Sequence, residues 1–510
     1  MGKGNYYLVT FIWNTLQKVF NAIVGFITVP LLLNYFGADK YGILSLATAC
    51  NGYMHLLDLG MNTGAVRYFS MWRADGNTDM LNKVSRTNIT FYGIIAIINA
   101  LLLVIVALFG ESWFSLNPEQ FYQLQKCLII IALFSIVSWG ATTFNQQLIA
   151  DKQMAYTSQI QTIMVVLKLL LIGCVFWFNL SLDAYFFFLT AITSSVIVPY
   201  IIKCKRSGLI STIKPGFYWS EFRTVFLFSM SIFALSLFQM TSTQTRPIIL
   251  GMFGTQGPSV NAEYRILEVV PQLVIMIAAT FSSMFLPKTT ELVVKSDNNE
   301  ICKFAYKWTL LTTIITCCLC FPFILGSKDV LIAYVGQTYG SLSIWLILWL
   351  VTTLVQVYSS PSYSLIMAYG KTKKLVYISA VACVLSLIIN AMLAPSVGVG
   401  SAVIGYFVYI FFSFICYYLF YYKQVLHISR VKIFMSFAKP TICAVSACLI
   451  TYYLFDGRLK FDIGSERVTY LVYFCIKTLV WAVTFGAMVL AFRLIRIDVK
   501  ERKVITKYDI

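Results

Sequence analysis

The feature that most constrains this chain is the recurrence of apolar runs long enough to cross a membrane. Runs of about 18 residues or more repeat from one end to the other, and each can span a hydrocarbon core of about 30 Å. Lipid offers the backbone no hydrogen-bond partners, so these runs must be helices. The composition agrees, because 59% of the 510 residues are hydrophobic and 12% are charged. The sequence therefore predicts an all-α, polytopic membrane protein.

The apolar runs indicate about fourteen transmembrane helices. We place them at 7–36, 41–64, 88–109, 122–148, 155–178, 182–202, 220–252, 262–286, 306–325, 341–368, 374–393, 397–422, 438–455 and 470–494. The first run is too long for a signal peptide and lacks a small-residue cleavage site, so we expect it to be a retained helix.

Basic residues gather in every second connection between these runs. The connection between the sixth and seventh runs, for example, holds Lys203, Lys205, Arg206 and Lys214. The alternate connections hold only Lys40, Lys328, Arg458, Lys460 and Arg467. Loops rich in Lys and Arg stay on the cytoplasmic side, which predicts cytoplasmic N- and C-termini. The net charge of +18 is thereby explained without a nucleic-acid partner.

An internal repeat is visible at the outer ends of two long helices. Pro30-Leu-Leu-Leu-Asn-Tyr-Phe-Gly37 in the first helix is similar to Pro247-Ile-Ile-Leu-Gly-Met-Phe-Gly254 in the seventh, an offset of six helices. An even offset means that both copies run in the same direction, as in a parallel repeat. We expect an N-terminal lobe over 1–217, a C-terminal lobe over 218–425, and two additional helices with a basic tail over 426–510.

Polar residues follow single faces of four otherwise apolar helices, at spacings of three and four. Such residues usually face protein or a wet cavity, because lipid cannot solvate them. We call these faces polar stripes, and the helices that carry them are the first two of each proposed lobe. They comprise Asn14, Gln17, Lys18 and Asn21; Asn51, His55, Asp58 and Asn62; Gln239, Ser242, Thr243 and Arg246; and Arg265, Glu268 and Gln272.

Structural explanations of the same stripes stay open. Polar groups also hydrogen-bond between helices, for about 0.6–2 kcal/mol per bond. Lys18, Arg246 and Arg265 can extend their charges to the membrane interface. Arg265 and Glu268 lie one turn apart and can neutralise each other, and Asp58 can serve as a packing or capping residue.

The cations inside the apolar runs point to an anionic cargo. A Lys or Arg at the centre of a membrane helix costs about 2.5–3.5 kcal/mol on insertion scales, and a cavity biased towards positive charge attracts anions. We therefore expect Asn14, Gln17, Lys18, Asn21, Gln239, Arg246 and Arg265 to bind substrate. Asp58 and Glu268 are the candidate coupling acids. The sequence gives no role for Lys168 or Lys477.

Metal and cofactor sites are not expected. The 13 cysteines lie almost all inside apolar runs, and the only histidines are His55 and His427. No Gly-rich nucleotide-binding loop is present, so ATP is not expected to be the direct energy source.

The chain resembles the polysaccharide-transporter family of lipid-linked oligosaccharide flippases. The resemblance is strongest over Val29-Pro-Leu-Leu-Leu-Asn-Tyr-Phe-Gly-Ala-Asp-Lys-Tyr-Gly-Ile-Leu-Ser-Leu46 and Leu57-Asp-Leu-Gly-Met-Asn-Thr-Gly-Ala-Val-Arg67. That family belongs to a superfamily that also contains the MATE multidrug exporters and the lipid II flippase. Asp58, Arg67 and the Gly-rich turn after the first helix match its pattern, whereas cargo-binding residues do not map reliably.

The resemblance implies movement of a polyprenyl-diphosphate-linked repeat unit from the inner to the outer leaflet by rocking of two lobes. It implies a bacterial plasma membrane location, a role in surface polysaccharide synthesis, and a polysaccharide polymerase as a candidate partner. The repeat unit, the coupling ion and the oligomeric state are not specified by the sequence.

Two other classes of protein remain as alternatives. A MATE-like exporter of cationic drugs should have an acid-rich cavity, and twelve helices would suffice for it. A membrane polymerase or ligase would expose a sizeable outer loop with catalytic residues, whereas the longest outer connections here are 110–121, 326–340 and 456–469. We therefore expect a transporter rather than an enzyme.

Overall fold

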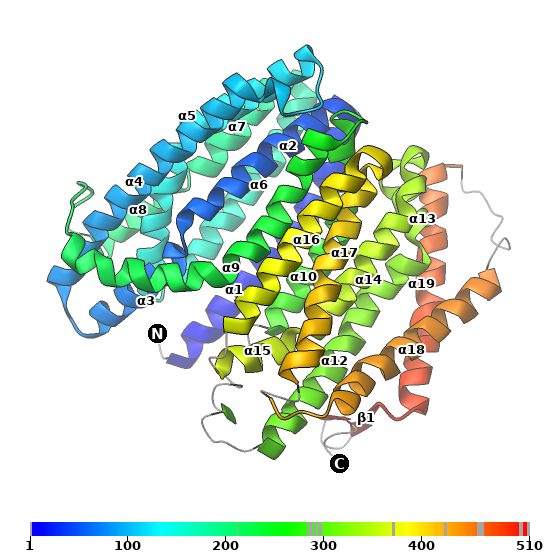
Figure 1. Cartoon of the computed structure of the whole chain (residues 1–510). Coiled ribbons are helices and arrows are strands. Elements are labelled where there is room, and N and C mark those ends of the chain that lie inside the picture. The colour runs from blue at the N-terminus through cyan, green and yellow to red at the C-terminus, as the bar shows by residue number, and fades with distance from the viewer. Residues whose placement is uncertain are drawn as a thin grey trace. The chain divides into compact units, whose positions relative to one another are not determined.

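The computed structural model describes residues 3–210, 212–282, 285, 289, 292–293, 298–369, 373–422, 426–455, 464–498 and 503–506. Over this part of the chain the fold is helical (Figure 1), which confirms the all-α prediction. The one departure is a short antiparallel hairpin in the basic tail, where β1 (Ile495–Asp498) pairs with β2 (Lys503–Thr506). The chain divides into two compact units, Met1–Arg265 with Asn390–Val399, and Ile266–Ile389 with Gly400–Ile510.

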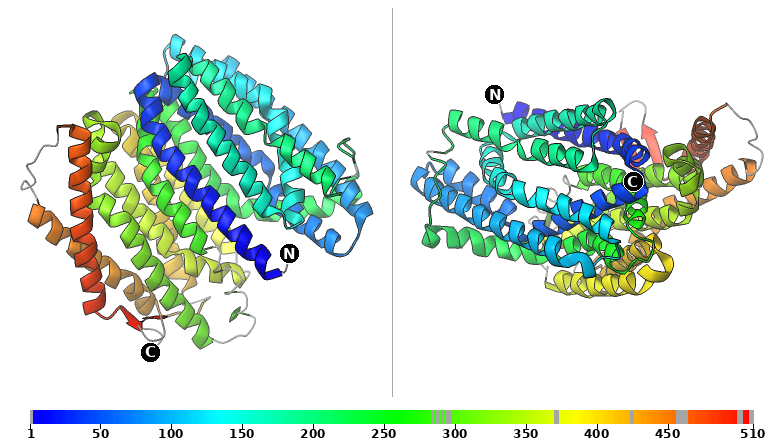
Figure 2. Two further views of the ribbon diagram at one scale, coloured as in Figure 1. Left: turned by 180° about the vertical axis from the view of Figure 1, so that it is seen from behind. Right: turned by 90° about the horizontal axis from the view of Figure 1, so that it is seen from above.

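The first unit contains the N-terminal helices, and α10 continues from it into the second unit. These helices are α1 (Lys3–Phe36), α2 (Ala38–Met54), η1 (His55–Asp58), α3 (Met61–Ala74), α4 (Thr78–Phe109), η2 (Gly110–Ser112), α5 (Pro118–Ala150), α6 (Met154–Phe178), α7 (Leu182–Ser194), α8 (Ile197–Arg206), α9 (Trp219–Phe253) and α10 (Ser259–Ser282). Within this unit α4 packs along α5, and α1 packs along α6 (Figure 2).

The second unit contains the C-terminal helices, except that the last residues of α16, from Asn390 on, belong to the first unit. They are α12 (Asn298–Leu325), α13 (Ser327–Val335), η3 (Gln337–Leu342), α14 (Ser343–Tyr358), α15 (Ser360–Ala368), α16 (Lys373–Val397), α17 (Val399–Cys416), the π-turn η4 (Tyr417–Tyr421), α18 (Arg430–Phe455) and α19 (Glu466–Ala491). Here α12 packs against α14 and α18, and α19 packs against α13 and α18.

Eleven helical segments in the described part of the chain are long and apolar enough to cross a membrane. The three other expected spans are also helical, as α2 with α3, α9 and α10. At about 1.5 Å per residue, the 24 residues of α10 reach about 36 Å. Large apolar side chains such as Leu101, Ile105 and Leu108 are exposed along one face of α4, as lipid contact requires. The protein is therefore a multi-pass membrane protein.

The second span is broken rather than one continuous helix over 41–64. The helix α2 ends at Met54, and Leu59 and Gly60 adopt left-handed φ angles of 51° and 71° before α3 begins. Gly60 accepts this conformation readily because it has no Cβ. The sixth and tenth expected spans are likewise divided, into α7 with α8 and α14 with α15. Pro361 at the start of α15 has no N–H with which to continue the hydrogen bonds of α14.

The repeated motif ends a long helix in both copies, although its glycines differ in backbone conformation, with φ of 82° at Gly37 and −69° at Gly254. The helices α1 and α9 have 34 and 35 residues, each contains its motif proline, and each ends at a Phe directly before the motif glycine. This is what a parallel duplication predicts. The lobe boundaries at 217 and 425 stay predictions, because a division by compactness does not test which helices move together.

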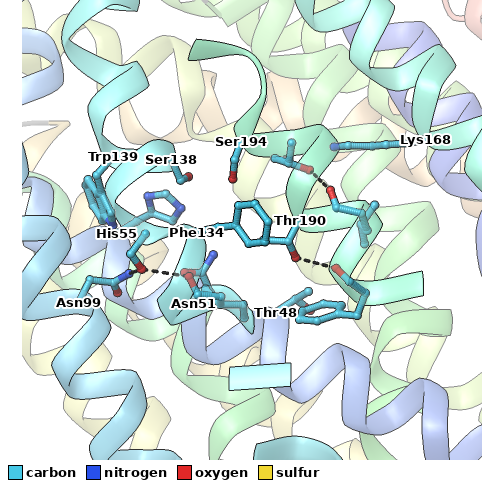
Figure 3. A pocket seen from close by; sticks show the side chains of 15 residues that line it. Thr48, Asn51, His55, Asn99, Phe134, Ser138, Trp139, Lys168, Thr190 and Ser194 are labelled. Atoms are coloured by element: carbon cyan, nitrogen blue, oxygen red, sulfur yellow. Dashed lines mark hydrogen bonds between the residues drawn. The ribbon is translucent and has the colours of Figure 1, made fainter. Parts of the chain in front are cut away.

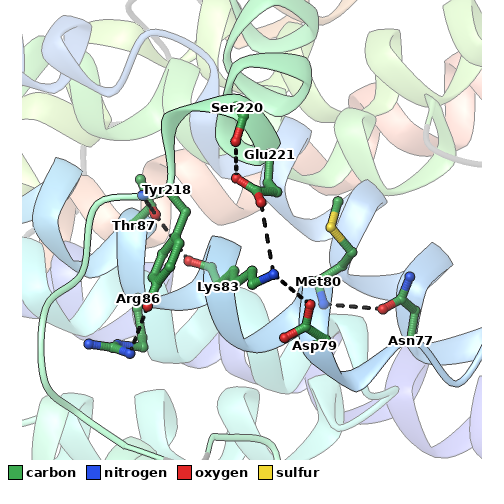
Figure 4. A network of polar contacts seen from close by, with 9 residues as sticks. All are labelled: Asn77, Asp79, Met80, Lys83, Arg86, Thr87, Tyr218, Ser220 and Glu221. Atoms are coloured by element: carbon green, nitrogen blue, oxygen red, sulfur yellow. Dashed lines mark hydrogen bonds and ion pairs between the residues drawn. The ribbon is translucent and has the colours of Figure 1, made fainter.

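The connection after α8 is held against the first turns of α4 (Figure 4). Arg86 donates to the carbonyl oxygens of Lys214 and Pro215, both at 3.3 Å. It also donates to the Tyr218 hydroxyl at 3.1 Å, as Figure 4 shows. The Tyr218 N–H donates to Thr87 Oγ1 at 2.9 Å. The α4 helix begins at Thr78, ten residues before the expected span, so Arg86 lies on a helix rather than in a loop.

Candidate functional site

Two polar cavities lie within the first unit, and Lys168 on α6 lines both. The first has a volume of about 240 Å³ and lies among α2, α4, α5, α6 and α7 (Figure 3). The second has a volume of about 330 Å³ and lies among α1, α5, α6, α7 and α8. Ser138 and Thr193 also line both cavities. We call them the α2 cavity and the α1 cavity.

The predicted stripe on α1 contributes to the α1 cavity. Gln17 and Asn21 line it, opposite Asn145 on α5 and Gln161 on α6. Asn14 lies one turn before Gln17, and its Nδ2 donates to the sulfur of Met154 at 3.9 Å. The α1 stripe therefore faces α6. Lys18 is partly buried, but it is not among the lining residues of either cavity.

The stripe on the second span contributes to the α2 cavity. Asn51 and His55 line it together with Asn99 on α4, and the His55 ring lies 5.2 Å from the ring of Trp139. In the view of Figure 3, Lys168 lies across the cavity from His55 and Trp139. The cavity thus combines a cation, amides, hydroxyls and aromatic faces.

Asp58 takes part in a chain of hydrogen bonds that reaches into the core of the first unit. Its Oδ1 accepts from the Tyr92 hydroxyl at 2.5 Å, and its Oδ2 accepts from the Asn62 N–H at 3.1 Å. Tyr92 in turn accepts from Gln146 Nε2 at 2.7 Å, and Gln146 accepts from Asn88 at 2.7 Å. Asp58 therefore fixes η1 and the start of α3 to α4. The structure gives it a positioning role, and coupling through it stays a prediction.

The predicted arginines are held by helix contacts. Arg246 is 3% exposed and donates from Nε to the Ser242 carbonyl at 2.7 Å. Arg265 donates to Ser45 Oγ at 3.2 Å and to Thr48 Oγ1 at 3.3 Å, which connects α10 to α2 beside the α2 cavity.

The other two predicted residues lie apart from both cavities. Gln239 is exposed on α9, where its carbonyl accepts from Thr243. Glu268 accepts from Gln272 at 3.4 Å, one turn away on α10. Neither lines the two cavities, and their predicted roles remain open.

Lys168 and Lys477, for which the sequence predicts no role, have different environments. The Lys477 ammonium pairs with Asp329 on α13 at 2.5 Å, so its charge is neutralised within the second unit. For Lys168, no hydrogen bond or ion pair is present in the part of the chain that the structure describes. The sequence does contain a pattern that could have identified Lys168 as a site residue. Gln161 and Lys168 are seven residues apart on α6, which puts both on one helical face.

The described residues include no group of three or more His, Cys, Asp or Glu side chains that could hold a metal ion. The lining residues of the α1 and α2 cavities also include no carboxylate. The groups that line the two cavities, a lysine, amides and hydroxyls among them, can bind hydroxyl-rich and anionic groups.

The fold is similar to that of known transporters. It matches the lipid II flippase MurJ in an inward closed conformation with a TM-score of 0.71 and 12% identity, covering 94% of this chain and 98% of that one. It matches an inward-facing multidrug resistance MATE family transporter of the MOP superfamily with a TM-score of 0.59 and 14% identity, over 87% and 99% of the chains. The eukaryotic MATE transporter AtDTX14 matches with a TM-score of 0.55 and 12% identity, over 84% and 97%.

The sequence comparisons give the family. No curated protein matches the chain. Residues 8–285, more than half of the chain, match the family model described as polysaccharide biosynthesis protein. The chain therefore belongs to the polysaccharide biosynthesis protein family, as the resemblance of its N-terminal motifs predicted.

Proposed function

We propose that this protein is a flippase that moves a polyprenyl-diphosphate-linked oligosaccharide repeat unit from the cytoplasmic to the outer leaflet. It would do so by alternating access in a bacterial plasma membrane, with both termini cytoplasmic, during surface polysaccharide synthesis. The observation that carries the proposal is the fold shared with a lipid II flippase over 94% of the chain, in a member of a polysaccharide biosynthesis family. The polysaccharide polymerase is the candidate protein partner.

The polar chemistry of the chain supports this cargo. A diphosphate needs cations, and sugar hydroxyls need amide and hydroxyl partners. Lys18, Arg246 and Arg265 are the candidate ligands of the diphosphate. Gln17 and Asn21 line a polar cavity beside Lys168, which suits them to sugar hydroxyls.

A MATE-like exporter is the second candidate function, because MATE transporters share the fold. An exporter of cationic drugs should carry acids where the cargo binds. The α1 and α2 cavities are both lined by Lys168 and by no carboxylate, which favours an anionic cargo.

The test is transport by the purified protein in proteoliposomes. A labelled polyprenyl-diphosphate oligosaccharide is supplied in the membrane, and its arrival in the opposite leaflet is measured with a membrane-impermeant glycosidase. Ethidium efflux is measured in the same vesicles, with protein-free vesicles as the control. Oligosaccharide movement without dye efflux supports the proposal, and dye efflux without oligosaccharide movement rejects it in favour of an exporter.

The cationic ligands are tested in the same vesicles. Neutralising Lys18, Arg246 and Arg265 together should slow oligosaccharide movement when the rate is expressed per amount of folded protein, which corrects for the helix contacts that Arg246 and Arg265 also make. Lys18→Arg should be milder than Lys18→Gln, because it keeps the charge and alters only the geometry. Full activity of the triple neutral variant would reject these three residues as diphosphate ligands.

A further inference from the structure

The α1 and α2 cavities share one cation that has no counter-charge. Lys168 lines both of them and is only partly exposed. In the described part of the chain, its ammonium has neither an acceptor nor an ion-pair partner. An unpaired ammonium inside a membrane helix is costly, and such residues usually mark a substrate or ion pathway. The geometry therefore calls for an anionic group beside Lys168.

Each cavity also contains a buried amide oxygen that lacks a donor. Asn99 lines the α2 cavity and Asn145 lines the α1 cavity, and the buried Oδ1 of neither residue has a hydrogen-bond partner among the described residues. The orientation of the Asn99 amide is fixed by its neighbours. Its Nδ2 donates to Ser135 Oγ at 2.8 Å, and that hydroxyl donates to the Ile131 carbonyl at 3.1 Å. The Asn99 oxygen is therefore left to accept from a ligand.

These groups together define the chemistry of a ligand. Lys168 supplies only donors, whereas Asn99 Oδ1 and Asn145 Oδ1 supply only acceptors. A simple inorganic anion satisfies the lysine but offers few protons to the amides, and a neutral sugar satisfies the amides but leaves the charge unpaired. A sugar that carries both hydroxyls and an acidic group satisfies both requirements. The ring faces of Trp139 and Phe134 in the α2 cavity can cover the apolar face of a pyranose.

We propose that the joined α1 and α2 cavities bind an acidic sugar residue, with its carboxylate on Lys168 and its hydroxyls on Asn99 and Asn145. The cavities, at about 240 and 330 Å³, lie near or below the lower end of the usual range of ligand sites, so each can hold one or two sugar rings. This inference deepens the proposed function, because it names a sugar class within the cargo and gives Lys168 a role.

The test measures binding of free sugars and needs no lipid-linked cargo. The full-length protein is placed in phosphatidylcholine nanodiscs, and the dissociation constants of glucuronate, glucose and inorganic phosphate are measured by saturation-transfer NMR. We expect glucuronate to bind about tenfold or more tightly than glucose, since one charge-assisted hydrogen bond is worth at least that factor. Lys168→Gln should remove this preference and Lys168→Arg should keep most of it. Lys152→Gln, which neutralises an exposed lysine outside both cavities, should leave it unchanged.

Several results would overturn the inference. Equal binding of glucuronate and glucose removes the acidic specificity, and phosphate binding as tight as glucuronate makes this an inorganic-anion site. Loss of glucuronate binding when phosphatidylglycerol is added to the nanodiscs assigns the cavities to an anionic lipid headgroup. A preference that survives Lys168→Gln places the site elsewhere. If glucuronate binds as expected and no lipid-linked oligosaccharide crosses the vesicles, the proposed function fails while the sugar site stands.

Discussion

Replacing Gly64 by Ala should destabilise the contact between α3 and α9. A Cβ at Gly64 would lie 1.9 Å from Ser229 Oγ, 3.1 Å from Ser229 Cβ and 3.4 Å from its Cα. The Ser229 hydroxyl can rotate only by leaving its 2.8 Å hydrogen bond to the Val225 carbonyl. The contact with Ser229 Cβ would stay too short after that rotation, so the two helices must separate.

The expected loss is the difference of two opposing effects. Overpacking of a close helix contact costs about 1–3 kcal/mol, and the lost Ser229 hydrogen bond adds about 1 kcal/mol. Exchange of Gly for Ala inside a helix stabilises by about 1 kcal/mol. The net loss in the free energy of unfolding should therefore be about 1–3 kcal/mol. Gly93→Ala on α4 is the matched control, because nothing lies within 4 Å of its added Cβ, and it should be neutral or slightly stabilising.

The assay is chemical unfolding in mixed micelles, followed by tryptophan fluorescence. Ser229→Ala should rescue Gly64→Ala in part, because it removes Oγ but keeps Cβ. Ser229→Gly should relieve the whole contact, although glycine itself costs about 1 kcal/mol in a helix. If Gly64→Ala is as stable as Gly93→Ala, or if neither change at Ser229 improves it, then the close approach of α3 and α9 is not the cause.

Three further perturbations test other contacts. Lys477→Met should lower the free energy of unfolding by about 3 kcal/mol, because it leaves Asp329 charged and buried without its partner. Adding Asp329→Leu to that variant should recover most of the loss. A double variant no more stable than Lys477→Met would reject the pairing. Arg86→Ala should speed amide hydrogen exchange over residues 212–222 about tenfold, since it removes three hydrogen bonds to that connection; Ile97→Ala, at an exposed position of the same helix, is its control, and equal exchange in both variants would refute the tether. Asp58→Asn should weaken the bond from Tyr92 and lower stability by about 1–2 kcal/mol; full transport driven by an imposed potential alone in that variant would exclude proton coupling through Asp58.

Much of the helical layout could be predicted from the sequence, because lipid imposes one requirement on every span. Apolar runs of sufficient length must be helical, so the order of the spans follows directly from the sequence. The breaks inside the second, sixth and tenth spans were missed. Hydropathy reports how apolar a segment is, and it does not report where the backbone leaves the helix, as it does at Leu59 and Gly60.

The candidate site was predictable in part, for a related reason. Spacings of three and four identify one face of a helix, and they correctly grouped Gln17 with Asn21 and Asn51 with His55. They do not say which helices face one another. Lys168 gains its meaning only because α5 and α7 pack beside α6 and bring Asn145 and Thr193 to it.

Ion pairs between residues far apart in the chain could not be predicted from the sequence either. The partner of Lys477 is Asp329, which lies 148 residues earlier on a short helix inside an expected outer connection. No periodicity within one span carries that information, since the pair forms only when α13 packs against α19. An intramembrane charge seen in a sequence alone is therefore as compatible with a structural ion pair as with a binding site. Only the structure separates Lys477 from Lys168.

The placement of charge in the first unit bears on how transport is driven. Both carboxylate oxygens of Asp58 accept hydrogen bonds, so protonating this group would disrupt the contact that fixes η1 to α4. The lining residues of the α1 and α2 cavities include no carboxylate, although His55 lines the α2 cavity. Moving a negative head group outward across an inside-negative membrane is favoured by about 2.3 kcal/mol per charge per 100 mV. A diphosphate and an acidic sugar each carry negative charge and so increase this electrical free energy. The cargo that suits the cavities lined by Lys168 is therefore also the cargo that the membrane potential drives most strongly. We propose the membrane potential as a driving force, and transport measured with the potential and the pH gradient imposed separately tests it.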